Sequence, residues 1–295
     1  MKNCLFQGVC TAQITPFSDG KIDWKCFDKL LKRQVASGVD AICVLGTTGE
    51  PCTLSLNEKK AVVMHARKII PHNIKLIVGT GSNNTKTAIR QTLMAKQLGA
   101  DGALVVTPYY NKANSNGILQ YYSQICSSCD LPIIAYNVPS RTGVNIKPNL
   151  ALRLSEIDGI VGIKEASGDI KQILELFEVA GKKMAIYCGD DILTYLFLCL
   201  GGQGVVSVSS NLLPKQMVHM CKSAFCNNQA SALEVHKKLL PLHNALQTEI
   251  NPVAIKTIMS HFLLCKKQFR LPLCESDLKT EKAILSATKH YSDFV

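Results

Sequence analysis

The sequence predicts an α/β fold, a (β/α)8 (TIM) barrel followed by an appended C-terminal helical segment. Eight short apolar runs alternate with longer amphipathic stretches up to about residue 210, a pattern typical of parallel strands joined by helical crossovers. No phosphate-binding glycine fingerprint follows the first run, so a closed barrel is favoured over an open doubly wound sheet. We expect the barrel to occupy residues 1–225 and the helical segment residues 226–295.

The eight predicted strands are short apolar runs bounded by glycine, proline or polar residues. Strands of a parallel sheet that is covered on both faces need no polar alternation. In chain order the runs are GVCTAQIT (8–15), AICVLG (41–46), IKLIVGT (74–80), GALVVT (102–107), PIIAYN (132–137), GIVGIK (159–164), MAIYCG (184–189) and GVVSVS (204–209).

The helices between these runs have recognisable ends. Ser55 and Glu58 form a capping-box pattern before KKAVVMHARKII, and Thr85 opens a helix that Gly99 closes. The segments SGVDAICV, LGADGALV and LGGQGVVS each place a helix-stopping glycine before a buried strand. After about residue 214 only helical patterns remain, which predicts the appended segment.

The composition indicates a compact protein of the cytoplasm. Of the 295 residues, 47% are hydrophobic and 19% are charged. We expect neither a secretory leader nor a membrane span, because no apolar run is long enough for either. The thirteen cysteines are scattered through apolar runs, as expected in a reducing compartment. The single CxxC pair, Cys126 and Cys129, has no second pair at zinc-site spacing, so we expect no metal site.

The net charge of +11 does not by itself indicate nucleic-acid binding. The basic excess lies in helix-like segments such as WKCFDKLLKR and NEKKAVVMHARK, without interleaved aromatic residues. Solvent-exposed helix faces explain it better than a nucleic-acid surface.

The carboxyl ends of the predicted strands carry an unusual density of reactive and polar residues. In a barrel these ends meet at one face, where catalytic groups gather. Lys164 ends the sixth run, and burial there would favour the neutral amine that a nucleophilic lysine requires. An ion pair with Glu165 is the competing interpretation, and position alone leaves both open.

Neighbouring strand ends supply further candidates. Tyr136 follows the apolar residues Pro132 to Ala135 of the fifth run, so its phenol is expected near Lys164, either as a proton relay or as a packed tyrosine with local hydrogen bonds. The turn Gly46–Gly49 offers the hydroxyls of Thr47 and Thr48 and backbone N–H groups suited to a small carboxylate, although a structural turn needs only the glycines. Arg141 could bind a second carboxylate bidentately.

These residues lie in the motifs GTTGE (46–50), TPYYNK (107–112), YNVPSRTG (136–143) and GIKEASGD (162–169). At these motifs the sequence resembles the dihydrodipicolinate synthase and N-acetylneuraminate lyase superfamily, over essentially the whole chain. The resemblance implies that Lys164 forms an imine with pyruvate and that Tyr136 is the proton donor and acceptor. It also implies that Thr47 links Tyr136 to Tyr110.

The resemblance assigns further positions and an assembly. Thr48 and the backbone at Val206 match pyruvate-binding positions, Arg141 matches the arginine that holds the carboxylate of the aldehyde substrate, and Gly189 lines the same pocket. The tyrosine matching Tyr110 reaches across a dimer interface in this superfamily. A homotetramer built as a dimer of dimers is therefore implied.

The loop that contains Arg141 favours the synthase branch, because the sugar-acid lyases of the superfamily use a different loop there. The implied reaction condenses pyruvate with L-aspartate 4-semialdehyde. It needs no metal or other cofactor, because the lysine imine is its own electron sink. A lyase acting on N-acetylneuraminate or a keto-deoxy sugar acid is the nearest alternative, and a non-catalytic binding protein is an alternative of another class.

Feedback inhibition by lysine is expected to be weak or absent. Asn83 and Tyr109 match the lysine site of inhibited members, whereas Pro51, Leu56 and Thr87 stand where those members carry small, polar or acidic residues. A further departure, Ala254 where many members have a second proline, is expected to have no catalytic consequence.

Overall fold

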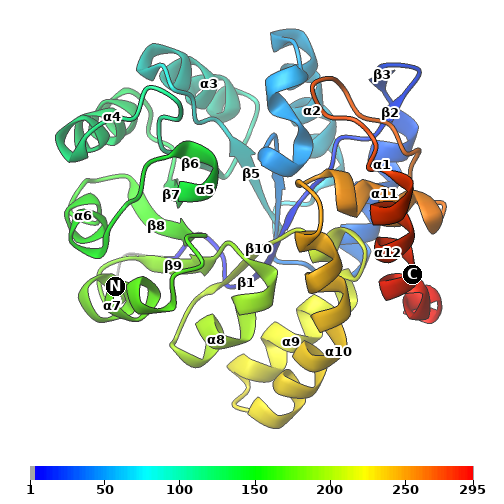
Figure 1. The fold of residues 1–295 in the computed structure, drawn as a ribbon. Coiled ribbons are helices and arrows are strands. Elements are labelled where there is room, and N and C mark those ends of the chain that lie inside the picture. The colour runs from blue at the N-terminus through cyan, green and yellow to red at the C-terminus, as the bar shows by residue number, and fades with distance from the viewer. Residues whose placement is uncertain (1–3, 295) are drawn as a thin grey trace.

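In the computed structural model, which describes residues 4–294, eight parallel strands close into a barrel surrounded by helices (Figure 1). The strands follow the order β1-β10-β9-β8-β7-β6-β5-β4, and β1 pairs with both β10 and β4 to close the ring. The predicted fold class is confirmed.

All eight predicted strands form, although several end earlier than their apolar runs because the chain bends into the loops above the barrel. The strands are β1 (Gly8–Ala12), β4 (Ala41–Val44), β5 (Lys75–Gly79), β6 (Gly102–Val106), β7 (Ile133–Asn137), β8 (Ile160–Glu165), β9 (Ala185–Cys188) and β10 (Gly204–Ser207). The helices that follow them in turn are α1 (Trp24–Ala36), α2 (Leu56–Ile69), α3 (Thr85–Gln97), α4 (Ser115–Ser128), α6 (Pro148–Leu154), α7 (Ile170–Ala180), α8 (Thr194–Cys199) and α9 (Pro214–Phe225).

Helix ends form as the sequence predicts. Ser55 accepts the Glu58 N–H at 3.2 Å while Glu58 accepts the Ser55 N–H at 2.8 Å, so the capping box is complete. Helix α3 begins at Thr85, and the side chain of Asn84 caps it by accepting the Thr87 N–H. Gly99 follows that helix with φ +84°, a conformation that favours glycine.

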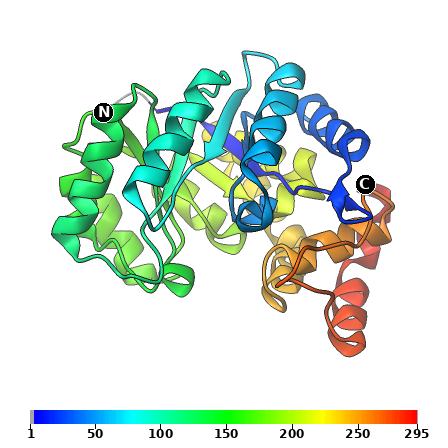
Figure 2. The same ribbon diagram turned by 90° about the horizontal axis from the view of Figure 1, so that it is seen from above.

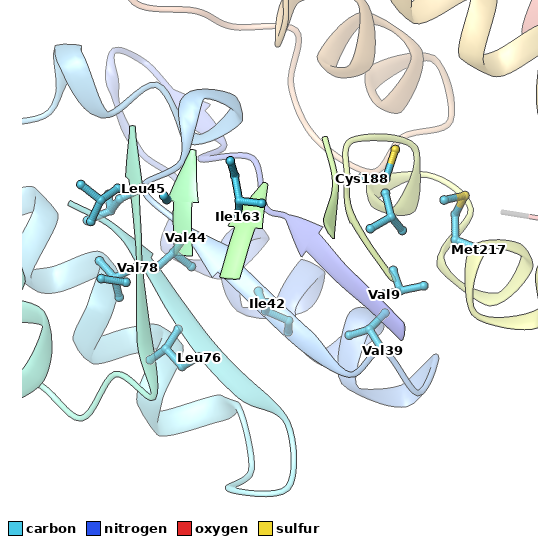
Figure 3. Packing of buried hydrophobic residues seen from close by; sticks show 14 of the residues in the cluster. Val9, Val39, Ile42, Val44, Leu45, Leu76, Val78, Ile163, Cys188 and Met217 are labelled. Carbon is cyan, nitrogen blue, oxygen red and sulfur yellow. The ribbon is translucent and has the colours of Figure 1, made fainter. Parts of the chain in front are cut away.

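The two faces of each barrel strand bury different sets of side chains. One set packs between the strands and the helices; in Figure 3, Ile42 and Val44 of β4 lie beside Leu76 and Val78 of β5. The other set fills the barrel interior. Its strand members are Cys10, Ala12, Ala41, Cys43, Ile77, Leu104, Ile134, Tyr136, Ala185, Tyr187 and Val206.

The amino-terminal end of the barrel is closed by aromatic packing. Phe6 stacks on Tyr187 with ring centroids 4.3 Å apart, and the Tyr187 hydroxyl donates to the Phe6 carbonyl at 2.9 Å. Gly162 makes room for this ring, because a Cβ there would lie 3.0 Å from Cε2 of Tyr187. The other end of the barrel is where the strand-end residues predicted to be functional gather.

Helices α10 (Gln229–Gln247), α11 (Val253–His261) and α12 (Leu278–Thr288) follow the barrel. In Figure 2 these helices, coloured yellow-orange to red, lie at one side of the barrel and away from the N-terminus. The division of the chain at residues 225 and 226 stays a prediction, since α10 packs against α9 and α12. A small hairpin of β2 (Phe17–Ser18) and β3 (Lys21–Ile22), and the short helix α5 (Pro139–Thr142), were not predicted.

No helix within residues 4–294 is long and apolar enough to cross a membrane. Among the same residues no disulfide bond joins the cysteines.

Candidate functional site

A cavity of about 460 Å³ opens at the carboxyl ends of the barrel strands. It brings together seven residues singled out from the sequence, which come from five different strand ends and are otherwise far apart along the chain. These residues are Thr47, Thr48, Tyr136, Arg141, Lys164, Gly189 and Val206.

Successive side chains of a strand point to opposite faces, and this alternation directs Lys164 and Tyr136 into the cavity. Lys164 shares its face of β8 with Gly162, whereas Ile163 between them packs against the helices. Tyr136 lies opposite Lys164 in the β7–β8 register. The Lys164 Nζ atom sits 4.2 Å from the centroid of the Tyr136 ring, and both side chains are buried, with 6% and 7% exposure.

The sequence left open a structural ion pair between Lys164 and Glu165, and the structure shows none. Glu165 points to the other face of β8, where it accepts hydrogen bonds from Asn137 Nδ2 at 2.9 Å, from the Ser167 N–H and from Gln172 Nε2. Burial raises the pKa of Glu165. Among the residues that the structure describes, the Lys164 ammonium has no ion pair and no hydrogen bond.

Gly189 fits closely against the Lys164 side chain. A Cβ at residue 189 would lie 2.9 Å from Cε of Lys164, 2.9 Å from the Glu165 carbonyl and 2.7 Å from Cβ of Ala166. A side chain there would therefore displace Lys164, and this explains why a glycine follows β9.

The Gly46–Glu50 loop is held in a strained conformation. Leu45 and Glu50 at its two ends have φ +57° and +53°, a region that side-chain-bearing residues rarely adopt. Gly79 of the neighbouring strand β5 leaves room for the backbone at Leu45. A Cβ at residue 79 would lie only 2.1 Å from the Leu45 carbonyl oxygen. The loop presents Thr47 and Thr48 to the cavity.

A buried ion pair fixes the far end of this loop. Lys256 of α11 lies 2.6 Å from the Glu50 carboxylate, both side chains are fully buried, and Lys256 also donates to the Thr15 carbonyl at 3.2 Å. Burial lowers the pKa of Lys256 while the charge of Glu50 opposes that shift. No local pattern in the sequence pairs these two residues, since 206 positions separate them.

Asn251 is a second contribution of the C-terminal segment that sequence reasoning missed. Its Nδ2 donates to the Thr48 hydroxyl at 3.0 Å, and its carbonyl accepts from the Arg141 guanidinium at 3.3 Å. Asn251 therefore contacts two predicted substrate-binding residues at once. Ala254, in the same NPVAIK segment, also lines the cavity.

Two aspartates that follow β9, Asp190 and Asp191, and His243 of α10 also line the cavity. Asp191 Oδ2 accepts the N–H groups of Val208 and Ser209 at 2.8 and 2.9 Å, while its Oδ1 is buried without a hydrogen bond among residues 4–294. His243 of α10 is 1% exposed, and neither ring nitrogen has a partner in that same part of the chain. Burial lowers the pKa of His243 to about 4.

The structure does not bring Tyr110 to Tyr136 and Thr47 within one chain. Tyr110 is 89% exposed, adopts φ +71° and lines neither this cavity nor the one beside it. Tyr109 lines an adjoining cavity of about 560 Å³ together with Pro51 and Thr87. Burial raises the pKa of Tyr109.

The other two residues discussed for lysine binding, Asn83 and Leu56, do not line that adjoining cavity. The Asn83 carbonyl accepts a hydrogen bond from Asn111, and Leu56 is 57% exposed at the start of α2. As for metals, no group of three or more histidine, cysteine or acidic side chains in residues 4–294 is placed to hold an ion.

Comparisons with known proteins agree along nearly the whole chain. A model of the Dihydrodipicolinate synthetase family matches residues 5–291. The chain is 43% identical over 280 residues to the 4-hydroxy-tetrahydrodipicolinate synthase of Thermotoga neapolitana, and this match covers 94% of the chain and 95% of that protein.

Solved structures give the same result. The crystal structure of dihydrodipicolinate synthase from Thermotoga maritima matches with a TM-score of 0.95 and 40% identity, covering 99% of this chain and 100% of the other. The chloride-inhibited synthase from Acinetobacter baumannii, complexed with pyruvate, matches with a TM-score of 0.95 and 39% identity, covering 98% of this chain and 99% of the other.

Proposed function

The chain belongs to the dihydrodipicolinate synthetase family, and from that premise we propose that it condenses pyruvate with L-aspartate 4-semialdehyde. The product is 4-hydroxy-tetrahydrodipicolinate, and the reaction is the first committed step toward diaminopimelate and lysine. The observation that carries the proposal is a buried lysine, Lys164, which forms no ion pair among the described residues and opens into a cavity lined by hydroxyl and guanidinium groups.

In the proposed mechanism Lys164 is the nucleophile. Its neutral amine attacks C2 of pyruvate, the ketone oxygen takes up protons and leaves as water, and an imine results. Loss of a proton from C3 gives an enamine, whose C3 attacks the aldehyde carbon and turns the aldehyde oxygen into a hydroxyl group. The substrate amine then adds to C2 and expels Lys164, which closes the ring.

Tyr136 is the proposed proton donor and acceptor for these steps. Its ring lies against Lys164, and the residue lines the cavity in which the substrates would bind. We propose that Thr47 links it to Tyr110 of a neighbouring copy of the chain, because Tyr110 of the same chain is exposed outside the cavity. This relay presupposes the homotetramer, a dimer of dimers, that the family resemblance implies.

The two substrate carboxylates have separate proposed partners. Thr48 and the backbone at Val206 would bind the carboxylate of pyruvate, and Arg141 that of the aldehyde. Asn251 supports both sites, since it hydrogen-bonds to Thr48 and Arg141. We propose that no metal and no further cofactor takes part, because a protonated imine withdraws electrons from C3 of pyruvate by itself.

The test is a comparison of substrates on the purified protein. Condensation of pyruvate with L-aspartate 4-semialdehyde is measured beside cleavage of N-acetylneuraminate and of keto-deoxy sugar acids. We expect kcat/KM to be highest for the semialdehyde by orders of magnitude, since Arg141 suits a short carboxylated aldehyde. A higher kcat/KM for any sugar acid would contradict the proposal.

A further inference from the structure

Three carboxylates line the active-site cavity, and the proposed mechanism uses none of them. They are Asp190 and Asp191, which follow β9, and Glu249, which follows α10. A cavity for two anionic substrates gains nothing from acidic groups unless one of those substrates also carries a positive charge. L-aspartate 4-semialdehyde has such a charge, because an ammonium group stands beside its carboxylate.

Two of the three carboxylates are poorly placed to receive a ligand. Asp191 holds the loop after β10 through the N–H groups of Val208 and Ser209, and its other oxygen is enclosed by protein. Glu249 accepts the N–H of the next residue, Ile250, at 2.7 Å, and it lies outside the strand ends of the barrel.

Asp190 is better placed. Its Oδ1 accepts from Gln247 Nε2 at 3.2 Å and from the Ile192 N–H at 3.3 Å, which fixes the carboxylate, while Oδ2 has no hydrogen bond within residues 4–294. Burial, and then the charge of Asp191, raise the pKa of Asp190, and Lys164 opposes the shift. The negative charge is therefore only partly compensated, and a cation beside it would be stabilised.

The barrel topology places Asp190 and Arg141 on either side of Lys164. Arg141 follows β7, Lys164 ends β8 and Asp190 follows β9, and these three strands are consecutive neighbours. Gly189, the residue before Asp190, is in contact with the Lys164 side chain. A substrate held by a carboxylate on one side and an ammonium on the other would lie across the reacting lysine.

We propose that the free oxygen of Asp190 binds the ammonium group of the aldehyde substrate and so selects a 2-amino aldehyde over an amine-free one. The inference rests on the proposed function and names a specificity-determining residue for it. Asp190 and Arg141 together then orient the substrate by two charges of opposite sign, which fixes the aldehyde carbon relative to the enamine.

The test compares the substrate with succinate semialdehyde, which has the same carbon chain and carboxylate but no amine. The variant Asp190→Asn keeps an acceptor for Ile192 and removes the charge. We expect KM for L-aspartate 4-semialdehyde to rise by about 10- to 100-fold, the loss typical of a hydrogen bond to a charged group. The inhibition constant of succinate semialdehyde should stay within about twofold of wild type, because it makes no ammonium contact.

Glu249→Gln is the matched control, since it removes a cavity-lining charge of the same sign, and both constants should stay at their wild-type values. Asp190→Ser, which retains a capping oxygen, is the second variant in case Asp190→Asn does not fold. An unchanged KM in the folded Asp190 variant, or a KM and an inhibition constant that rise together, would overturn the inference.

Trapping of pyruvate with borohydride separates this inference from the proposed function. Wild type and the Asp190 variant should form the pyruvyl adduct equally, because Asp190 is assigned to the second substrate only. Failure of the variant alone would overturn the role of Asp190, whereas failure of the wild type would overturn the lysine-imine mechanism itself.

Discussion

At the scale of single residues, Gly189 leaves the space that the Lys164 side chain occupies. In Gly189→Ala the new Cβ would lie 2.9 Å from Cε of Lys164 and displace the amine. A nucleophile misplaced by about 1 Å loses about 100-fold or more in rate, so we expect kcat to fall by at least that factor while the protein still folds. Circular dichroism and steady-state kinetics measure the two effects.

Gly117→Ala is the control for this substitution, because a Cβ there would meet nothing closer than 3.3 Å. A Gly189→Ala enzyme with wild-type kcat would show that the Lys164 side chain does not need its present position.

The burial of His243 leads us to expect that acid destabilises the fold. Burial lowers its pKa to about 4, whereas an unfolded histidine has a pKa near 6.5. The unfolded chain therefore binds this proton at a higher pH than the folded chain does. The free energy of unfolding should fall as pH drops from about 6.5 to 4, by up to about 3 kcal/mol from this group.

Urea denaturation of wild type and His243→Gln at pH 7 and pH 4.5 measures this contribution. The variant should lose less stability over that interval than wild type, while His72→Gln, at an exposed histidine, should behave like wild type. The role given to His243 is wrong if wild type and His243→Gln lose stability equally.

Sequence reasoning found residues whose position along a strand determines where they point. Lys164 and Tyr136 end apolar runs, and strand geometry alone aims such residues at the mouth of a barrel. It missed Asn251 and the partners of Asp190, because their contacts join segments that no local pattern relates. The hydrogen bond from Asn251 to Thr48 spans 203 positions.

At the scale of elements, the ion pair between Glu50 and Lys256 ties the Gly46–Glu50 loop to α11. Lys256→Met would leave the Glu50 carboxylate buried without its partner, which costs about 3–5 kcal/mol. We expect the free energy of unfolding to fall by that amount and KM for pyruvate to rise, because the same loop carries Thr48. Chemical denaturation and kinetics measure both.

The double variant Glu50→Gln with Lys256→Met should recover part of the stability, since it buries no lone charge. Lys238→Met is the matched control, because Lys238 pairs with Glu234 on the exposed face of α10 and should contribute nothing measurable. Equal effects of Lys256→Met and Lys238→Met would contradict the role of the buried pair.

Element types and order were predictable, and element ends were less so. Eight apolar runs became eight strands, and the capping box at Ser55 formed as written in the sequence. The run 204–209 continues past the end of β10 at Ser207, because Ser209 already belongs to the turn that Asp191 holds. Such ends depend on long-range hydrogen bonds, which periodicity does not contain.

At the scale of the whole molecule, the exposed Tyr110 predicts that the active site is shared between copies of the chain. Tyr110→Phe and Lys164→Ala should each be nearly inactive. Mixed, unfolded and refolded together, they should regain about a quarter of wild-type activity, because half of randomly paired dimers carry one intact site. Activity assays together with analytical ultracentrifugation test this.

Mixing Tyr136→Phe with Lys164→Ala is the control and should restore nothing, since these two residues lie in the same chain's cavity. Absence of recovery in the first mixture, despite assembled oligomers, would show that Tyr110 does not act across an interface.

The overall fold followed from the alternation of strands and helices and from the missing phosphate-binding fingerprint. The proposed assembly could not be derived in the same way, because the surface that would bury Tyr110 has no periodic pattern in the sequence. Only the folded structure distinguishes Tyr110, through its exposure of 89% and its φ of +71°.

The most direct test of the central claim is the intact mass of the protein after borohydride reduction with pyruvate, compared with Lys164→Ala. The lysine-imine mechanism predicts an increase of about 72 Da in wild type and none in the variant. A folded wild-type protein that gains no mass, or a variant that gains the same mass, would contradict the assignment of Lys164 as the nucleophile.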